Sequence, residues 1–245
     1  MIRYQGVSMS YDGKEKVLSD LNFEIKEGEF FVLVGPSGSG KTTTLKLINR
    51  LIEQTEGDIF FQGKNIKDYP LRDMRLEMGY VLQQIALFPN LTVAENVGLI
   101  PEMKKMDKKE ISKRVDSLLE QVDLDPKVYR NRLPEDLSGG EKQRIGILRA
   151  IAANPKVLFM DEPFSALDPI SRSQLQDLVK KLHNDFMITT VFVTHDMREA
   201  LKLADRICIM RSGKIIQIGS PDDIVNNPAS DFVANFFKEE GEVHE

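Results

Sequence analysis

The chain has 245 residues, 41% of them hydrophobic and 29% charged, which is enough length and apolar content for a sizeable core. Its 33 basic and 38 acidic residues give a net charge of −5, which excludes a global electrostatic attraction to nucleic acid or anionic lipid. The one cysteine, Cys208, excludes an intrachain disulfide. The N-terminus has no signal-peptide core, and no apolar run reaches the roughly 18 residues of a membrane span. We therefore expect any membrane role to be exercised from the surface, through a partner.

The N-terminal part of the chain predicts strands at 2–11 and 21–26. The continuous apolar run at 29–35 is typical of a strand buried on both faces of a parallel sheet. A glycine-rich loop follows this strand, and apolar residues at helical spacing then predict a helix. Shorter strands are expected at 58–61 and 79–83.

Residues 90–136 differ in composition, because they are rich in charged residues and their apolar positions recur at helical spacing. This segment is predicted to be a helical insertion. A long helix is expected from 138 to about Ala153, where Asn154 and Pro155 end it. Further helices are expected at 170–183, at 197–203 and after Ser220. They alternate with predicted strands at 157–160, 189–193, 207–210 and 214–219. Such alternation predicts an α/β sheet.

The strongest motif follows the buried strand and matches the pattern G-x-x-x-x-G-K-[ST]. Its glycines let backbone N–H groups converge on an anion, and the next helix adds its positive N-terminal end. Lys41 is expected to reach the β- and γ-phosphates of a nucleotide, and the Thr42 hydroxyl to bind Mg²⁺. A glycine-rich turn that only caps a helix is the alternative, but the strand before the loop and the helix after it favour phosphate binding. The predicted nucleotide-binding residues here are Gly35, Pro36, Ser37, Gly38, Ser39, Gly40, Lys41, Thr42 and Thr43.

Two carboxylates, Asp161 and Glu162, follow the apolar run at 157–160. They stand at the C-terminal end of a predicted strand, where open α/β sheets bind ligands. Asp161 is expected to hold Mg²⁺ through water, and Glu162 to polarise the attacking water as a general base. Acidic residues also commonly end strands, so this assignment depends on the phosphate-binding motif.

The stretch from Ser138 to Glu141 allows two interpretations that are compatible. Ser138 and Glu141 fit a capping box that opens the long helix. Gly139 and Gly140 at the same helix start would expose backbone N–H groups to an anion.

The order of these motifs resembles that of the ABC-transporter ATPases, and the resemblance covers essentially the whole chain. It implies a single ABC ATPase domain over 1–245, with the fold of a P-loop NTPase (RecA-like) core. That core, with an N-terminal antiparallel β subdomain, is expected at 1–85 and 155–220. The helical subdomain with the signature motif is expected at about 88–153, and a helical tail at 220–245.

The resemblance also implies roles for residues that their own patterns leave ambiguous. Tyr11 matches the aromatic residue that stacks on adenine, although alone it would read as a strand or turn residue. Gln83 matches the glutamine that senses Mg²⁺ and the attacking water. His195 matches the switch histidine that contacts the γ-phosphate. His183 and His244 match nothing and are expected at the surface.

In the family, the signature motif reaches across a head-to-tail dimer and holds the γ-phosphate of ATP on the partner copy. Ser138, Gly139 and Gly140 match those positions, and Asp168 matches a loop that crosses the dimer interface. The family's next residue is most often Gln, whereas this chain has Glu141. The implied catalytic residues are Glu162, His195, Gln83 and Lys41, and the implied Mg²⁺ ligands are Thr42, Gln83 and Asp161.

Several stretches are similar to the importers of quaternary-ammonium osmoprotectants such as glycine betaine, carnitine and choline, among them 47–52, 83–89 and 145–150. The resemblance implies ATP and Mg²⁺ as ligands, a homodimer, integral membrane permease subunits and, indirectly, an extracellular solute-binding protein. It places the chain at the cytoplasmic face of the cell membrane. Long members of this subgroup carry two regulatory CBS modules after the core, and this sequence is expected to lack them.

Other functions remain open at this point. A non-transport ABC ATPase acting on ribosomes or nucleic acid usually has a coiled-coil insertion or two cassettes, and the acidic balance predicts no nucleic-acid partner. A P-loop small-molecule kinase would need neither the signature motif nor His195. An exporter subunit, or an importer of another small solute, would share every motif of this chain, because the ATPase subunit does not touch the solute.

Overall fold

The computed structural model describes residues 1–83, 86–165 and 167–241, so His244 lies outside the described residues. The chain divides into two compact units. The first unit combines Met1–Leu71 with Met187–Glu245, and the second is Arg72–Phe186.

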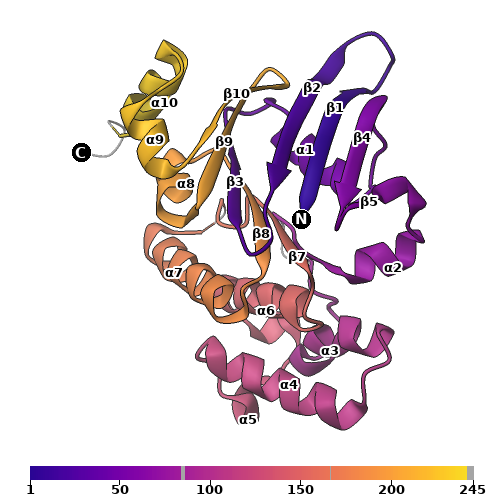
Figure 1. Cartoon of the computed structure of the whole chain (residues 1–245). Coiled ribbons are helices and arrows are strands. Elements are labelled where there is room, and N and C mark those ends of the chain that lie inside the picture. Colours follow the sequence, from indigo (N-terminus) through magenta and orange to yellow (C-terminus); the bar gives the residue numbers. More distant parts are fainter. Residues whose placement is uncertain (84–85, 166, 242–245) are drawn as a thin grey trace. The chain divides into compact units, whose positions relative to one another are not determined.

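The first unit contains an antiparallel sheet of four strands. Its strands, in spatial order, are β2 (Lys16–Ile25), β1 (Ile2–Ser10), β4 (Glu56–Phe61) and β5 (Lys64–Asn65), as Figure 1 shows. Buried and exposed residues alternate along much of β2, which is the pattern of a sheet with one face on the core. Tyr4 and Phe23 lie opposite each other across β1 and β2, and their rings stack at 4.4 Å between centroids.

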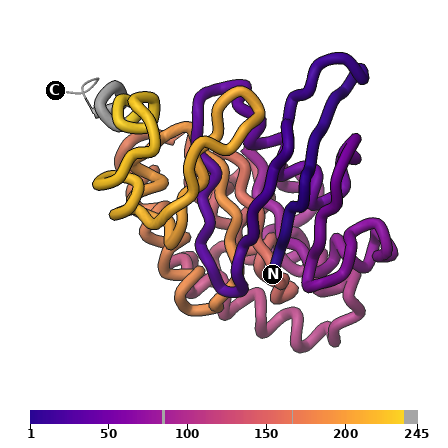
Figure 2. Tube along the Cα trace, turned by 45° about the horizontal axis from the view of Figure 1, so that its top comes forward, coloured from indigo at the N-terminus to yellow at the C-terminus, as the bar shows by residue number. Residues whose placement is uncertain are grey.

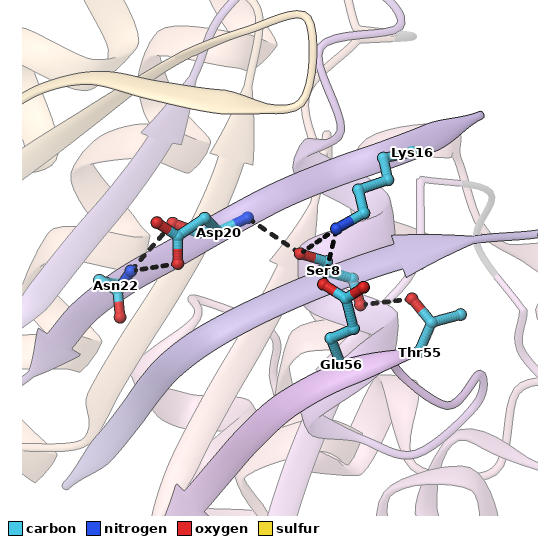
Figure 3. Close-up of polar contacts among 6 residues, drawn as sticks. All are labelled: Ser8, Lys16, Asp20, Asn22, Thr55 and Glu56. Carbon is cyan, nitrogen blue, oxygen red and sulfur yellow. Dashed lines mark hydrogen bonds and ion pairs between the residues drawn. The ribbon is translucent and has the colours of Figure 1, made fainter. Parts of the chain in front are cut away.

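A polar network around Ser8 joins β1, β2 and the start of β4 where the register of the sheet is irregular (Figure 3). Ser8 is only 2% exposed, and its hydroxyl accepts a hydrogen bond from the Asp20 N–H at 3.1 Å. The Ser8 carbonyl accepts from Thr55, and Lys16 forms an ion pair with Glu56 at 2.6 Å. The network supplies partners for backbone groups that the bulged ladder leaves unpaired.

The first unit also contains the buried strand β3 (Phe30–Val34), which pairs in parallel with β8 (Thr189–Thr194) and β9 (Arg206–Arg211). All five residues of β3 are buried, as the apolar run predicts. Strand β10 (Lys214–Gly219) forms an antiparallel hairpin with β9. The helices of this unit are α1 (Lys41–Ile48), the 3₁₀ helix η1 (Ile66–Asp68), α8 (Met197–Leu203), α9 (Pro221–Asn226) and α10 (Asp231–Gly241).

The second unit is mostly helical, with one parallel strand pair. The paired strands are β6 (Met78–Val81) and β7 (Val157–Asp161). Its helices are α3 (Val93–Met103), α4 (Lys108–Gln121), α5 (Pro126–Tyr129), η2 (Pro134–Asp136), α6 (Gly139–Ile151) and α7 (Pro169–Phe186), and α2 (Leu71–Leu76) starts at its boundary. Helix α3 packs against α4 and α6, so the segment at 90–136 forms the helical insertion that its periodicity predicts.

Two predictions about individual segments are wrong, and one helix was missed. Strand β2 begins at Lys16 rather than at residue 21, because its first half, in which only Leu18 is buried, pairs with the end of β1 through irregular register. Helix α2 was not predicted. His183 lies on the inner face of α7 and is 7% exposed, so it is not a surface histidine.

In the part of the chain that the structure describes, no helix combines the length and apolarity needed to cross a bilayer.

Gly57 offers a test of how tightly β4 lies on β1. Gly57 and Gly63 share a backbone φ of 78°, but an added Cβ at Gly57 would overlap the carbonyl oxygens of Gln5 and Gly6, whereas one at Gly63 would meet nothing within 4 Å. We expect Gly63→Ala to lower the free energy of unfolding by about 1 kcal/mol, and Gly57→Ala to lower it by about 3 kcal/mol or more. Urea unfolding followed by circular dichroism measures both, and equal losses would contradict this packing.

Candidate functional site

The glycine-rich loop joins the end of β3 to the start of α1 and passes close to other backbone segments. A Cβ added at Gly35 would overlap the carbonyl oxygen of Met210 in β9. Gly40 has a φ of 100°, and a Cβ there would overlap the side chain of Leu18. A side chain therefore fits at neither Gly35 nor Gly40, and the loop leads directly into the N-terminus of α1, the end of a helix that attracts anions.

Lys41, the first residue of α1, is held inside this loop. Its ammonium group donates hydrogen bonds to the carbonyl oxygens of Gly35 at 2.7 Å and Pro36 at 3.1 Å, and the residue is 5% exposed. The neighbouring Ser39 hydroxyl is buried and has no hydrogen-bond partner among the described residues. A buried cation and an orphaned hydroxyl group are both satisfied by an anionic oxygen ligand. The loop thus fits the phosphate group that its sequence predicts.

His195 reaches the same sheet edge as this loop. Strands β3 and β8 are parallel neighbours, with Val34 opposite Thr194, so the loop and His195 both follow the C-terminal ends of adjacent strands. The Thr194 hydroxyl donates to Glu199 at 2.6 Å and accepts from the Asp196 N–H at 3.0 Å, which fixes the backbone on both sides of His195. His195 itself is exposed.

Tyr11 stands on the turn between β1 and β2. Figure 2 shows this turn as an indigo loop at the upper right. The Asp12 carboxylate accepts hydrogen bonds from the N–H groups of Lys14 at 2.9 Å and Glu15 at 3.2 Å. These backbone donors lower the pKa of Asp12 and shape the turn. The Tyr11 ring is 63% exposed, so a face is open for stacking.

In the second unit, the structure brings Gln83 and Glu162 to one place through Ser165. Asp161 ends β7 and is 8% exposed, and Glu162 after it has a φ of 46°, a conformation that non-glycine residues rarely adopt. The Ser165 hydroxyl donates to the Glu162 carbonyl oxygen at 3.1 Å, and the Gln83 amide donates to the Ser165 hydroxyl at 3.4 Å. Ser165 was not a predicted site residue, because only the fold places it between the two.

Ser138 and Glu141 form the predicted capping box at the start of α6. The Glu141 N–H donates to the Ser138 hydroxyl at 3.3 Å, and the Ser138 N–H donates to the Glu141 carboxylate at 2.7 Å. A Cβ added at Gly139 or Gly140 would meet nothing within 4 Å in the described part of the chain. Packing inside this unit therefore does not require these glycines, whereas close approach of an external group to the helix start does.

A cavity of about 510 Å³ opens beside this helix start and includes Asp168 in its lining. Asp168 caps α7, because its carboxylate accepts from the N–H groups of Ile170 at 3.1 Å and Ser171 at 3.0 Å. A hydrogen bond from the Ser171 side chain, together with these backbone bonds, lowers the pKa of Asp168. The structure thus places Asp168 and the residues Ser138–Gly140 around one open space.

A second cavity of about 410 Å³ lies in the same unit and is mainly apolar. Phe88, which is 46% exposed, stands in its wall, and the Arg149 guanidinium lies over the Phe88 ring at 5.9 Å and donates to the Ala86 carbonyl oxygen. The other lining residues include Leu76, Tyr80, Ile100, Met103 and Pro155. Burial lowers the pKa of Arg149.

A protein-only metal cage is not found among the residues that the structure describes, since no three His, Cys, Asp or Glu side chains gather there. Mg²⁺, the ion that the sequence predicts, usually takes one or two protein ligands and completes its shell with waters and substrate phosphates. The Thr42 hydroxyl in the first unit and the Asp161 carboxylate in the second are oxygen ligands of the required kind.

Comparison with known proteins identifies the family of the chain. The family model described as ABC transporter matches residues 18–165. The choline transport ATP-binding protein OpuBA of Bacillus subtilis (strain 168) is 50% identical over 240 residues, which are 98% of this chain and 63% of that protein. The glycine betaine/carnitine/choline transport ATP-binding protein OpuCA of the same organism is 49% identical with the same coverages. This chain therefore spans less than two thirds of the length of both relatives.

Among solved structures, the chain is similar to the ATP-binding cassette MJ0796 in a dimeric, post-hydrolysis state bound to ADP and Pi. The TM-score is 0.79 at 35% sequence identity, and the match covers 90% of this chain and 99% of that one. This likeness confirms the predicted α/β fold class.

Proposed function

Because the chain belongs to the ABC transporter family, we propose that it is the ATP-hydrolysing subunit of an importer of quaternary-ammonium compounds such as glycine betaine, carnitine and choline. One observation carries the ATPase assignment: the buried Lys41 ammonium lies in a bare-backbone loop beside an orphaned hydroxyl group, which suits a polyphosphate. The names of the relatives support the solute class.

The proposed nucleotide site assigns a separate task to each group of residues. The loop 35–43 binds the phosphates, Tyr11 stacks on the base and His195 contacts the γ-phosphate. Thr42, Asp161 and Gln83 hold Mg²⁺, which neutralises phosphate charge when bound. Glu162 accepts the proton of the attacking water, and the Ser165 bridge to Gln83 keeps these two residues together.

The other half of the site is proposed to act on a second copy of the chain. Ser138, Gly139 and Gly140 would hold the γ-phosphate of ATP on the partner in a head-to-tail homodimer, with Asp168 at the crossing. The glycines at a helix start that is open to external groups support this arrangement. ATP then favours the closed dimer, because the γ-phosphate gains contacts there that it lacks in the open state.

The apolar cavity around Phe88 is proposed to receive the membrane permease subunits, at the cytoplasmic face of the membrane. A half-exposed aromatic ring beside an apolar hollow is the usual form of a docking surface. In this proposal the single domain 1–245 keeps an ATP-binding core at 1–85 and 155–220, a helical subdomain at about 88–153 and a C-terminal tail at 220–245.

Glu162→Gln tests the catalytic assignment. The amide keeps the shape of the side chain but cannot accept the proton, so we expect ATP binding to persist and turnover to fall about 10²-fold or more. ATP then stays in place and the chain accumulates as a dimer, which light scattering after gel filtration detects. A variant that remains monomeric in saturating Mg-ATP would contradict the sandwich mechanism.

Thr42→Ala tests the metal assignment. Loss of the hydroxyl removes one proposed Mg²⁺ ligand, so ATP affinity should become less dependent on Mg²⁺. Calorimetric titrations with Mg-ATP and with ATP in EDTA measure this dependence. Thr43→Ala is the matched comparison, because it removes a hydroxyl proposed to bind phosphate rather than Mg²⁺ and should keep the metal dependence. If Thr42→Ala leaves the metal dependence of the wild type intact, the role of Thr42 is wrong.

Phe88→Ser tests docking and solute together. The polar side chain weakens the apolar contact, so we expect poorer co-purification with the permease subunits and slower uptake of labelled glycine betaine. Val225→Ser, at a residue 52% exposed in α9, should change neither. Normal assembly of the Phe88 variant would refute the docking site, and a wild-type complex that takes up no quaternary-ammonium compound would refute the solute class.

A further inference from the structure

An acidic residue lies at an unexpected place in the proposed half-site. Glu141 follows Ser138, Gly139 and Gly140 and lines the same cavity of about 510 Å³. If these residues hold the γ-phosphate of a second copy, a free carboxylate at that position would repel it. The Glu141 carboxylate must therefore be engaged in hydrogen bonds with other groups of the chain.

Both oxygens of the Glu141 carboxylate are hydrogen-bonded. One accepts from the Ser138 N–H at 2.7 Å, within the capping box. The other accepts from the Tyr129 hydroxyl at 2.6 Å, a short distance typical of a hydrogen bond to an ionised acceptor. The hydrogen bond from Tyr129 contributes most to lowering the pKa of Glu141. It therefore stabilises the charged form of the carboxylate in this position.

Tyr129 is itself held from both sides. It ends the short helix α5, and the guanidinium of Arg132 lies 4.4 Å from the centre of its ring. The backbone around it is tied to α3, because Ala94 and Val93 donate hydrogen bonds to the carbonyl oxygens of Arg130 and Arg132, both at 2.9 Å. The hydroxyl that reaches Glu141 thus comes from a fixed scaffold rather than from a mobile loop.

We propose that Tyr129 is a positioning residue for the signature half-site: its hydroxyl group holds the Glu141 carboxylate against the start of α6, so that the acidic side chain does not turn toward the γ-phosphate bound by Ser138–Gly140. The role of Tyr129 rests on the proposed ATP-sandwich dimer. It also explains how this chain uses Glu where the family most often has Gln. A glutamine carries no charge and needs no such restraint.

A double-mutant cycle tests the role of Tyr129 in full-length chains that all carry Glu162→Gln to suppress turnover. The four proteins are this parent, Tyr129→Phe, Glu141→Gln and the combination of both. Light scattering after gel filtration gives the Mg-ATP concentration at which half of each protein is dimeric. We expect Tyr129→Phe to raise this concentration about tenfold, the effect of losing one hydrogen bond to a charged group. Added to Glu141→Gln, the same substitution should have almost no effect, because the charge is already gone.

The outcomes separate a positioning role from a structural one. If Tyr129 only stabilises α5, the defect of Tyr129→Phe persists in the Glu141→Gln chain, and the positioning role is wrong. The positioning role is also wrong if Tyr129→Phe dimerises at the same Mg-ATP concentration as its parent. A parent that never dimerises would instead overturn the sandwich mechanism itself. The affinity for a fluorescent ATP analogue at protein concentrations that keep the chains monomeric should be equal in all four proteins. Tyr129→His retains a hydrogen-bond donor and should therefore recover part of the lost dimerisation. If Tyr129→Phe lowers the melting temperature, the comparison between its effects with Glu141 present and with Glu141→Gln still tests the positioning role.

Discussion

Residues 35–40 connect the end of β3 to the start of α1, and β3 is buried along its whole length. Met210 and Leu18 crowd this passage at Gly35 and Gly40, so only bare backbone fits. The turn buries the Lys41 ammonium among carbonyl oxygens of its own loop. A cation in that position is stabilised by an anion on its open side, and the proposed nucleotide site rests on that requirement.

The start of α6 meets a different requirement. Its first N–H groups are only partly satisfied by the capping box, and two glycines keep side chains away from them although the described residues leave room for side chains. An isolated copy gains nothing from this openness. The loop of the first unit offers a buried cation and the helix start of the second offers free donors, and a γ-phosphate between two copies would use both. The acidic Glu141 is compatible with this use only because Tyr129 and Ser138 occupy its carboxylate.

The features that the sequence predicts correctly are those whose causes lie close together along the chain. The capping box spans one helical turn, and the β3 run is apolar throughout, so both were predictable. The Tyr129–Glu141 bond was not, because its partners are 12 residues apart and α5 is too short to show a period. Ser165 escaped prediction for the same reason: only folding brings it between Gln83 and Glu162.

Burial and strand register depend on tertiary packing as well. His183 shares the helical face of Leu175, Val179 and Leu182, but a histidine gives no burial signal of its own, and only Leu18 is buried among the first five residues of β2. The roles of Tyr11, Asp168 and His195 came from motif order. The structure contributes their settings: an exposed ring on a turn, a helix cap beside a cavity, and a place on the sheet edge next to the phosphate loop.

The central claim is that one copy supplies the phosphate loop and another the signature residues of each hydrolytic site. The most direct test mixes two inactive variants, Lys41→Ala and Ser138→Arg, and measures ATPase activity. In a head-to-tail dimer of the two, one site combines the intact loop of one copy with the intact signature of the other. The mixture should therefore regain activity, up to about a quarter of the wild-type value. A mixture as inactive as its separate components would contradict the claim.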